Sequence, residues 1–392
     1  MSQRPIILII CDYYLPGFES GGAMRTIVNM VERMSDEFDF RIATRDRDGI
    51  LATKPYDTVR IDDWNRVGNA DVYYMSPGKT GLGSLRSLIK AVNPSAIYVN
   101  SFFSPLTIAL LYLRKRRRIQ SVPIILAPEG EFSEGALLIK RVKKTLYMTA
   151  AKSLQLLANI TWKAAAESEV AEIQRALGNI ENIHIAPNLP PVLNASDRKT
   201  IKPNKSPGLA RMVFLSRYMR KKNFNWLLEN LTDVGGKLLI DICGPLEEKD
   251  YWEEAQQLIE KLPKNIRIEA KGPVPHEAVA ETLSQHDFFI LPTIGENFGH
   301  VFIEAFEAGC PVITSDRTPW RDLEEKGVGW DLSLDAPEKW IHVINECIAM
   351  SADDFAAMSQ RSQEFAAAWS SAPELEESNR AVLRAATAKG RI

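Results

Sequence analysis

The chain has 392 residues, of which 45% are hydrophobic and 25% are charged, and its formal net charge is −2. A chain of this length favours two domains over one. A net charge so close to zero argues against a general nucleic-acid-binding protein, which carries a large basic excess. The composition is typical of a soluble enzyme and predicts no nucleic-acid partner.

The N-terminal segment MSQRPIILIICDYY contains an apolar run that is too short for a signal peptide. No window reaches the roughly eighteen apolar residues of a membrane-spanning helix. The cysteines form no CxxC pair, and three of the four lie in or beside strand-like runs: Cys11, Cys243 and Cys310, with Cys347 as the fourth. We therefore predict buried free thiols in a reducing compartment, and a cytoplasmic protein.

In the first half of the chain, short apolar runs alternate with longer helical patterns. The apolar runs predict strands at residues 6–10, 40–44, 71–75, 96–100, 123–127, 161–166 and 182–187. The helical patterns cover residues 22–34, 105–117, 134–157 and 169–177. Short apolar runs between helices are typical of strands buried on both faces of a parallel sheet. We predict a doubly wound, Rossmann-like domain over residues 1–190.

A stretch rich in Pro, Asn, Ser and Lys interrupts this pattern and predicts a linker at residues 191–208. A second series of strands follows, at residues 211–216, 237–242, 266–271, 287–292 and 311–315. We predict a second Rossmann-like domain over 209–368 and a C-terminal helix over 369–392 that returns to the first domain. Doubly wound sheets bind ligands beyond the carboxyl ends of their strands, so a ligand site is expected in a cleft between the domains.

The first candidate site is the glycine-rich segment GFESGGAMRT after the first strand. Gly17, Gly21 and Gly22 allow a tight turn that leaves N–H groups at a helix N-terminus, where an anion can bind. The segment is not a GxGxxG motif, and a glycine turn that serves packing alone is the alternative.

The second candidate is the basic segment SRYMRKKN at the start of the second domain. Arg217 follows a buried strand and Lys222 lies five positions later, before a helix whose apolar residues face inward. Cations at this place can bind a diphosphate and offset the charge that grows on a phosphate leaving group. We expect the intervening Arg220 and Lys221 to be solvated.

The third candidate is GENFGHVFIEAFEAG, which follows the strand DFFILP. Glu296 is predicted on a loop at the carboxyl end of that strand, and Glu304 in the second turn of a helix that begins near Gly299. The first N–H groups of this helix point into the same space. A carboxylate pair beside a helix N-terminus suits a ligand with hydroxyl and phosphate groups. We assign the third acid, Glu307, to solvent.

Together these segments resemble glycosyltransferase family 4, a family of retaining enzymes with the GT-B fold that use nucleotide-sugar donors. The resemblance covers about residues 6–330. The motifs that carry it are SGGAMRT, APEGEFSEGALLIKRVKK, SRYMRKKN, DICGP, KGPVPHE and DFFILPTIGENFGHVFIEAFEAGCPVITSD. The segment APEGEFSEGAL is similar to that of members that build bacterial surface polysaccharides.

The resemblance implies a role for each matched residue. Glu304 would accept hydrogen bonds from the ribose, Glu296 would bind a hydroxyl of the donor sugar, and Arg217 with Lys222 would bind the diphosphate. The diphosphate would also be bound by the N–H groups of Asn297, Phe298, Gly299 and His300, and Gly21 and Gly22 would close over the donor from the opposite domain. The base would lie near Gly272 and Val274, with Gly244 and Pro245 lining the cleft.

One departure concerns the loop APEGEF, where many members place a histidine or an arginine and this chain has Glu129. His184 is the one histidine before the linker, and it lies in a strand-like run, so a histidine-assisted mechanism is not expected. Three acidic residues are left to position the acceptor hydroxyl: Asp12, Glu129 and Glu131.

The resulting hypothesis is transfer of a sugar from a nucleoside diphosphate sugar to a glycan or lipid-linked acceptor, with retention and without a metal or other cofactor. Three alternatives stay open: a nucleotide-sugar 2-epimerase, a glycosidase that uses Glu296 and Glu304 as acid and nucleophile, and a non-catalytic partner-binding subunit. The basic amphipathic stretch 137–156 predicts contact with an anionic membrane surface, with a solvated helix face as the alternative.

Overall fold

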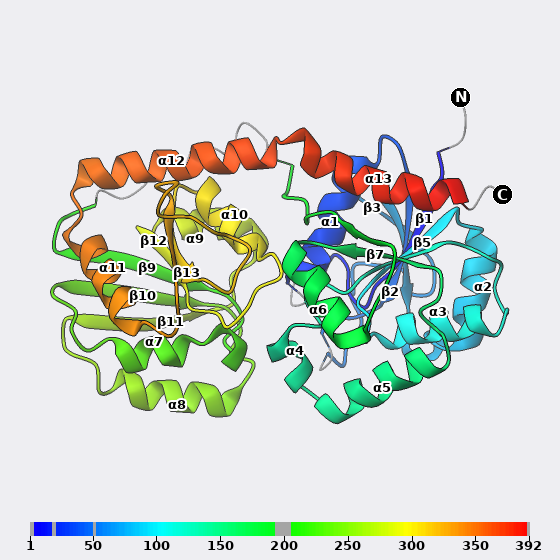
Figure 1. The fold of residues 1–392 in the computed structure, drawn as a ribbon, viewed down its shortest axis with the longest axis horizontal. Helices are drawn as coiled ribbons and strands as arrows, with labels where there is room; N and C mark the ends of the chain where they lie inside the picture. The colour runs from blue at the N-terminus through cyan, green and yellow to red at the C-terminus, as the bar shows by residue number, and fades with distance from the viewer. Residues whose placement is uncertain (1–3, 18–20, 50–51, 193–204, 390–392) are drawn as a thin grey trace. The chain divides into compact units, whose positions relative to one another are not determined.

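The computed structural model of the chain describes residues 4–17, 21–49, 52–192 and 205–389. The chain divides into two compact units (Figure 1). Unit 1 comprises Met1–Val192 together with Ala372–Ile392, and unit 2 comprises Leu193–Ser371. Most of the predicted linker at 191–208, and residues 18–20 of the glycine-rich segment, lie outside the described residues.

Unit 1 is built on an eight-stranded sheet in the order β3-β4-β2-β1-β5-β6-β7-β8. Its strands are β1 Ile6–Ile10, β2 Asp39–Arg45, β3 Trp64–Val67, β4 Ala70–Met75, β5 Ala96–Asn100, β6 Ile124–Ala127, β7 Ile160–Ala164 and β8 Ile183–Ile185. The central strands are apolar and buried on both faces, as helices on either side of a parallel sheet require.

The helices of unit 1 connect these strands and cover the sheet (Figure 1). They are α1 Gly22–Met34, α2 Leu82–Val92, α3 Pro105–Lys115, α4 Glu134–Leu138, α5 Arg141–Ser153, α6 Glu167–Leu177 and the C-terminal α13 Pro373–Lys389. One face of the sheet, which includes Ile97, Val99 and Trp162, shares a hydrophobic core with α2, α3 and α6. The helix α13 packs against β5, β6 and β7.

The structure corrects two expectations for unit 1. The edge strand β3 was absent from the prediction, and it pairs antiparallel with β4, so the sheet is not purely parallel. The stretch 134–157 was predicted as one helix, but it forms α4 and α5, which are separated at Ile139 and Lys140. Lys140 has φ 55, in the left-handed region, and this conformation interrupts the helix.

Unit 2 is built on a six-stranded parallel sheet in the order β11-β10-β9-β12-β13-β14. Its strands are β9 Leu209–Leu215, β10 Lys237–Cys243, β11 Ile266–Gly272, β12 Phe288–Leu291, β13 Val312–Ser315 and β14 Gly329–Leu332. Its helices are α7 Phe224–Asn230, α8 Lys249–Ile259, α9 His276–Ser284, α10 His300–Glu307, α11 Pro337–Ala349 and α12 Ala352–Ser370, with a 3₁₀ turn at Arg220–Lys222. The edge strand β14 was not predicted.

The C-terminal helix α13 is anchored to unit 1 by polar contacts as well as by packing. Arg380 forms ion pairs with Asp36 at 3.0 Å and with Glu37 at 3.0 Å, and Arg384 pairs with the same Glu37 at 2.6 Å. Asn379 donates a hydrogen bond to the Pro187 carbonyl at 2.8 Å. The four cysteines are buried free thiols, as predicted. No helix in the described part of the chain combines the length and apolar character that a bilayer crossing requires.

Candidate functional site

Two loops of unit 2 meet at the carboxyl ends of neighbouring strands. Because β12 pairs with β9, the loops that follow these two strands leave the same edge of the sheet. They are tied together at Lys221, whose carbonyl accepts hydrogen bonds from the Ile294 N–H at 3.0 Å and from Thr293 Oγ1 at 3.1 Å. This arrangement brings the predicted basic segment and the predicted acidic loop into one site.

Lys222 and Glu296 form a direct ion pair in this site. Their side chains are only 12% and 11% exposed, and Thr293 Oγ1 also donates to Glu296 Oε1, at 3.4 Å. Burial lowers the pKa of the Lys222 ammonium, although Glu296 opposes this effect. Burial alone would raise the pKa of the Glu296 carboxyl, but Lys222 and Lys221 outweigh it and hold the pKa below its usual value. The pair is therefore a shielded contact between a cation and a carboxylate.

Arg217 lies at the same edge of the sheet but is more exposed. Its guanidinium pairs with Glu247 at 3.3 Å, and the two side chains are 45% and 38% exposed. An exposed pair of this kind contributes little to stability and exchanges partners readily. Arg220 forms another surface ion pair, with Glu254 at 2.6 Å, which agrees with its expected place on a solvated loop.

The helix α10 begins at this site, directly after the acidic loop. Gly299 is its N-cap residue with φ 72, and a Cβ there would come within 2.7 Å of the Phe302 ring. Phe298 and His300 are buried on either side of this glycine. The Phe298 carbonyl accepts a hydrogen bond from Trp320 Nε1 at 2.7 Å. These contacts fix the first turn of the helix, and Asn297 and Glu304 are both half-buried beside it.

The third acid of the segment GENFGHVFIEAFEAG differs from the expectation. Glu307 was assigned to solvent, but it is half-buried and its Oε1 accepts a hydrogen bond from Ser370 Oγ at 3.5 Å. Ser370 is the last residue of α12, so Glu307 joins the two helices α10 and α12 within unit 2.

The residues predicted around the base lie at the end of β11 and just after it, and the predicted cleft residue Gly244 follows the neighbouring strand β10. Gly244 has φ 149, and a Cβ there would come within 2.0 Å of the Ser216 carbonyl oxygen. A glycine is therefore needed for the loops after β9 and β10 to approach each other. Gly272 has φ 80 with open space at its Cβ position, and Val274 packs against the core of the unit.

In unit 1, Gly21 is the N-cap of α1 with φ 62, and Gly22 is the first residue of that helix. The Cβ position of Gly21 is open, whereas a Cβ on Gly17 would meet the Tyr56 hydroxyl at 2.4 Å and Asp48 at 2.8 Å. Packing therefore requires the glycine at position 17, and backbone conformation favours the one at position 21. The roles of Gly21 and Gly22 toward a donor stay predictions.

All three acidic residues predicted on the acceptor side have protein partners. Asp12 pairs with Arg45 at 2.9 Å. Glu131 accepts hydrogen bonds from Ser101 Oγ at 2.6 Å, from the Phe102 N–H at 2.5 Å and from the Phe103 N–H at 3.2 Å. Burial raises the pKa of Glu131 in spite of these donors. Its contacts give Glu131 a structural role that needs no acceptor.

The third, Glu129, belongs to a buried polar group that we call the Glu129 cluster: Tyr98, Glu129, Lys163, Glu169 and Asn188. Its members come from β5, from the loop after β6, from β7, from α6 and from the segment after β8. Lys163 Nζ donates to Asn188 Oδ1 at 2.8 Å, and Asn188 Nδ2 donates to Glu129 Oε2 at 2.7 Å. Of these residues only Glu129 was predicted from the sequence. Lys163, a lysine inside the strand ITWKA, is the feature that could have indicated a buried polar group.

Glu169 is the second carboxylate of the cluster and the most deeply buried one. Its two oxygens accept hydrogen bonds from the Gly130 N–H at 2.6 Å and the Ala165 N–H at 2.7 Å. Burial, and then the nearby charge of Glu129, raise its pKa to about 7. The side chain thus takes up a proton within the physiological pH range.

This raised pKa predicts that stability falls as pH increases from about 4.5 to 7, because the folded chain binds a proton that the unfolded chain has released. Glu169→Gln should remove this pH dependence, which amounts to about 3 kcal/mol over the whole range. Urea unfolding at pH 5, 6, 7 and 8 measures it, with the exposed Glu167→Gln of the same helix as the matched control. Identical pH slopes in the wild-type chain and both variants would contradict the assignment.

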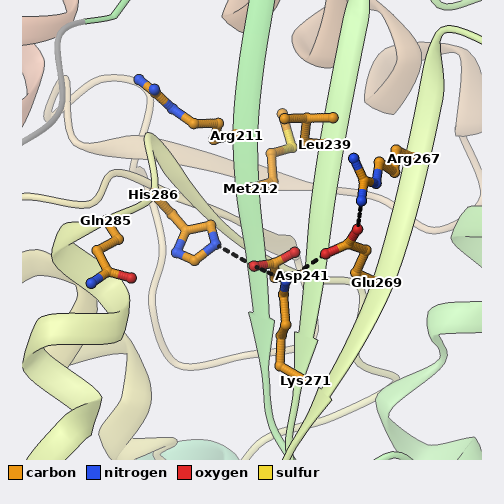
Figure 2. Close-up of a pocket in the computed structure, with 9 residues that line it drawn as sticks. All are labelled: Arg211, Met212, Leu239, Asp241, Arg267, Glu269, Lys271, Gln285 and His286. Carbon is orange, nitrogen blue, oxygen red and sulfur yellow. Dashed lines mark hydrogen bonds and ion pairs between the residues drawn. The ribbon is translucent and has the colours of Figure 1, made fainter.

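Unit 2 also contains a cavity of about 280 Å³, which is lined by residues of β9, β10 and β11 and by the turn before β12 (Figure 2). Figure 2 shows a row of linked side chains made of His286, Asp241, Lys271, Glu269 and Arg267, with Arg211 apart from it. Arg267 and Lys271 pair with Glu269, and Asp241 contacts His286 at 3.3 Å and Lys271 at 3.7 Å. The predicted donor residues are not among those that line this cavity, which is therefore separate from the site at Lys222 and Glu296.

Two doubly wound sheets, one of which carries a lysine–glutamate pair and a helix N-terminus at its carboxyl edge, define the class of GT-B proteins. Residues 196–365 match the family model described as "Glycosyl transferases group 1". This match confirms the predicted resemblance to glycosyltransferase family 4 for the second half of the chain.

Curated relatives match over short segments. A 2-deoxystreptamine N-acetyl-D-glucosaminyltransferase of Niallia circulans is 29% identical over 123 residues, which are 31% of this chain and 31% of that protein. The GPI3 subunit of a phosphatidylinositol N-acetylglucosaminyltransferase of Saccharomyces cerevisiae is 25% identical over 92 residues, which are 21% of this chain and 20% of that subunit. The chain thus spans about a third or less of the length of these relatives.

Solved structures match over nearly the whole chain. HepE of Anabaena, in complex with UDP and glucose, has a TM-score of 0.70 at 16% identity and covers 97% of this chain and 100% of its own. The sucrose-phosphate synthase of Thermosynechococcus elongatus has a TM-score of 0.72 at 16% identity, with 98% and 100% covered. WaaG, described as involved in lipopolysaccharide biosynthesis, has a TM-score of 0.64 at 13% identity, with 96% and 98% covered. These likenesses confirm the predicted GT-B fold.

Proposed function

We propose that the chain is a retaining glycosyltransferase that moves a sugar from a nucleoside diphosphate sugar to an acceptor hydroxyl. The observation that carries this proposal is the shielded contact between Lys222 and Glu296 beside the N-terminus of α10. It lies in the segment that matches the family model. HepE, which shares the fold, was crystallised with UDP-glucose, and this supports a nucleotide-sugar donor.

The chemistry follows from the charges that these residues can place around a donor. Lys222 and the N–H groups at the start of α10 can bind diphosphate oxygens, and Arg217 can join them when it leaves its exposed pair with Glu247. Positive groups held in a partly dry site stabilise the charge that develops on the departing diphosphate. Glu296 and Glu304 are acceptors suited to sugar and ribose hydroxyls. The sugar then passes to the acceptor oxygen, whose proton is released.

A nucleotide-release assay tests this function. The chain is incubated with UDP-, GDP- and ADP-sugars, with and without acceptors such as octyl glycosides and short-chain polyprenyl diphosphate sugars. The proposal predicts nucleotide release from one donor type that depends on an acceptor. Release of nucleotide and free sugar without any acceptor would favour an epimerase or a hydrolase. Absence of both release and nucleotide binding would favour a partner-binding subunit.

We also infer that the enzyme binds its acceptor at a membrane, and that α4 and α5 of unit 1 rest on an anionic membrane surface. This segment exposes large apolar side chains, with Val142 at 74%, Leu146 at 66% and Leu138 at 66% exposed. Basic residues accompany them, including the exposed Lys140 and Lys143. An apolar face flanked by lysines and arginines binds acidic lipid headgroups and the upper acyl region.

The run RKRRR at the end of α3 lies beside the same segment, because the Arg114 guanidinium donates to the carbonyls of Leu156 at 2.9 Å and Ala158 at 2.6 Å. The basic charge of α3 thus adds to that of α5. The GPI3 and WaaG names refer to lipid-linked products, which supports an acceptor at a membrane.

Substitutions on this face should abolish membrane binding. Val142→Asp/Leu146→Asp is expected to lose most co-sedimentation with vesicles that contain about one third phosphatidylglycerol, because each aspartate removes apolar contact and adds a repelled charge. Glu167→Gln, at an exposed position of α6 outside this segment, is the control and should sediment as the wild-type chain does. Equal sedimentation with neutral vesicles would contradict electrostatic docking. Wild-type behaviour of the aspartate variant would contradict the assigned face.

A further inference from the structure

The Glu129 cluster of unit 1 has two polar atoms whose hydrogen-bonding capacity is not met by the protein. Glu129 Oε1 and the Tyr98 hydroxyl are shielded from solvent, and neither has a hydrogen-bond partner among the residues that the structure describes. A buried carboxylate oxygen without a donor is costly, and in native proteins such atoms are satisfied by a ligand or by an ordered water. Because a carboxylate oxygen only accepts hydrogen bonds, the group that satisfies Oε1 must be a donor, such as a hydroxyl group.

The other oxygen of Glu129 is held firmly. Oε2 accepts from Asn188, and the amide oxygen of Asn188 accepts from the Lys163 ammonium, so that a cation orients the carboxylate through one amide. Lys163 and Asn188 are 3% and 2% exposed, which leaves them little freedom to find other partners. The negative charge of Glu129 is thus balanced from one side, while Oε1 has no donor on the other.

The backbone around this group is also fixed. Glu129 itself has φ 52, in a region that non-glycine residues seldom occupy. The carbonyl of Pro187 accepts a hydrogen bond from Asn379 of α13 at 2.8 Å, and that of Leu189 accepts one from Asn29 of α1 at 2.7 Å. The residues on both sides of Asn188 are therefore anchored to helices of unit 1.

The position of the cluster in the sheet is a further observation. The cluster follows β6 and β8 and includes Lys163 near the end of β7, at the edge of the sheet where the carboxyl ends of parallel strands bind ligands. On β5 and β7 the neighbouring side chains Ile97, Val99 and Trp162 face the hydrophobic core on one side of the sheet. Because strand side chains alternate, Tyr98 and Lys163 face the opposite side, together.

We propose that Glu129 binds a hydroxyl group of the acceptor sugar through Oε1, and that Lys163 and Asn188 are positioning residues that hold its carboxylate for this contact. The inference rests on the proposed glycosyltransferase function and assigns the acceptor contact to unit 1. It explains why a lysine is buried in an otherwise apolar strand: without its charge, two carboxylates would share the site.

The test compares Glu129→Gln, Lys163→Met, Asn188→Ala and the double variant Glu129→Gln/Lys163→Met, with the exposed Glu167→Gln as the matched control. The acceptor is the octyl glycoside or polyprenyl diphosphate sugar that supports transfer in the nucleotide-release assay. Each single variant should raise the acceptor KM about tenfold or more and leave the donor KM within about twofold. The control should change neither constant.

The double variant separates positioning from stability. Lys163→Met alone should lower the melting temperature, because Glu129 and Glu169 lose their cation. The double variant removes one charge of each sign, so its melting temperature should recover relative to Lys163→Met while its acceptor KM stays high. Recovery of the wild-type acceptor KM together with the stability would overturn the proposal and leave Glu129 as a structural counter-ion.

Other results are equally decisive. A folded Glu129→Gln variant with an unchanged acceptor KM would mean that an ordered water satisfies Oε1, and would also overturn the proposal. Failure of the wild-type chain to transfer sugar to any acceptor would refute the proposed function instead, and the inference would fall with it. The two failures are distinguishable because only the second one is seen in the wild-type chain.

Discussion

Replacement of Lys222 by alanine is expected to lower turnover by about a hundredfold or more, because a preorganised charge beside a leaving group contributes a few kcal/mol to the transition state. The lysine is nearly buried and contacts Glu296 directly, so no exposed side chain can replace it without a rearrangement of the loop. Steady-state measurement of nucleotide release with the donor and acceptor found for the wild-type chain gives the effect.

Two comparisons make this result interpretable. Lys221→Ala changes the preceding lysine, whose hydrogen bonds to the acidic loop use its backbone carbonyl and whose charge acts on Glu296 without an ion pair, so turnover should change only a few-fold. Lys222→Ala leaves Glu296 buried without its cation, and this can destabilise the loop. The double variant Lys222→Ala/Glu296→Gln restores the charge balance. Near-normal turnover in folded Lys222→Ala would refute the role of Lys222.

Glu296→Gln is expected to have opposite effects on nucleotide binding and on sugar transfer. In the structure the Glu296 carboxylate is bound to the Lys222 ammonium, so a diphosphate must compete with the carboxylate for the same cation. Removal of the carboxylate charge should tighten binding of a nucleoside diphosphate about fivefold to tenfold, an electrostatic gain of about 1 kcal/mol. The loss of an acceptor for the sugar hydroxyl should lower kcat/KM for transfer about a hundredfold.

Titration calorimetry with UDP, GDP and ADP measures the first effect, and initial rates measure the second. Glu247→Gln provides the matched control, because Glu247 pairs with the exposed Arg217 and its removal should change nucleotide affinity by about twofold at most. Weaker nucleotide binding in Glu296→Gln would show that the carboxylate supports the diphosphate site and does not compete for it.

The fold could be predicted from the sequence wherever apolar runs were long and uninterrupted. The strands β1 and β5 and the helix α1 were predicted with the bounds that the structure shows. The edge strands were missed because burial does not dictate their composition: β3 reads WNRV and β14 reads GWDL, and both mix polar and apolar residues. The break between α4 and α5 was missed because neither Gly nor Pro marks it, and a lysine adopts the left-handed conformation instead.

The candidate site could be predicted only residue by residue. Lys222 and Glu296 were identified separately by their places after strands, but they are 74 positions apart, and their contact depends on the adjacency of β9 and β12. Sequence periodicity does not determine strand order. For the same reason the partners of Glu129 could not be predicted. Asn188 lies 59 positions away and reaches Glu129 only because β6, β7 and β8 are neighbours in the sheet.

The central claim is that this chain transfers a sugar from a nucleotide sugar with retention. Proton NMR of the reaction with the active donor and an octyl glycoside acceptor tests it most directly, because the anomeric coupling reports the configuration of donor and product in one tube. The account predicts a new glycoside with the anomeric configuration of the donor, formed only when acceptor is present. A product of inverted configuration, or free sugar formed without acceptor, would contradict it.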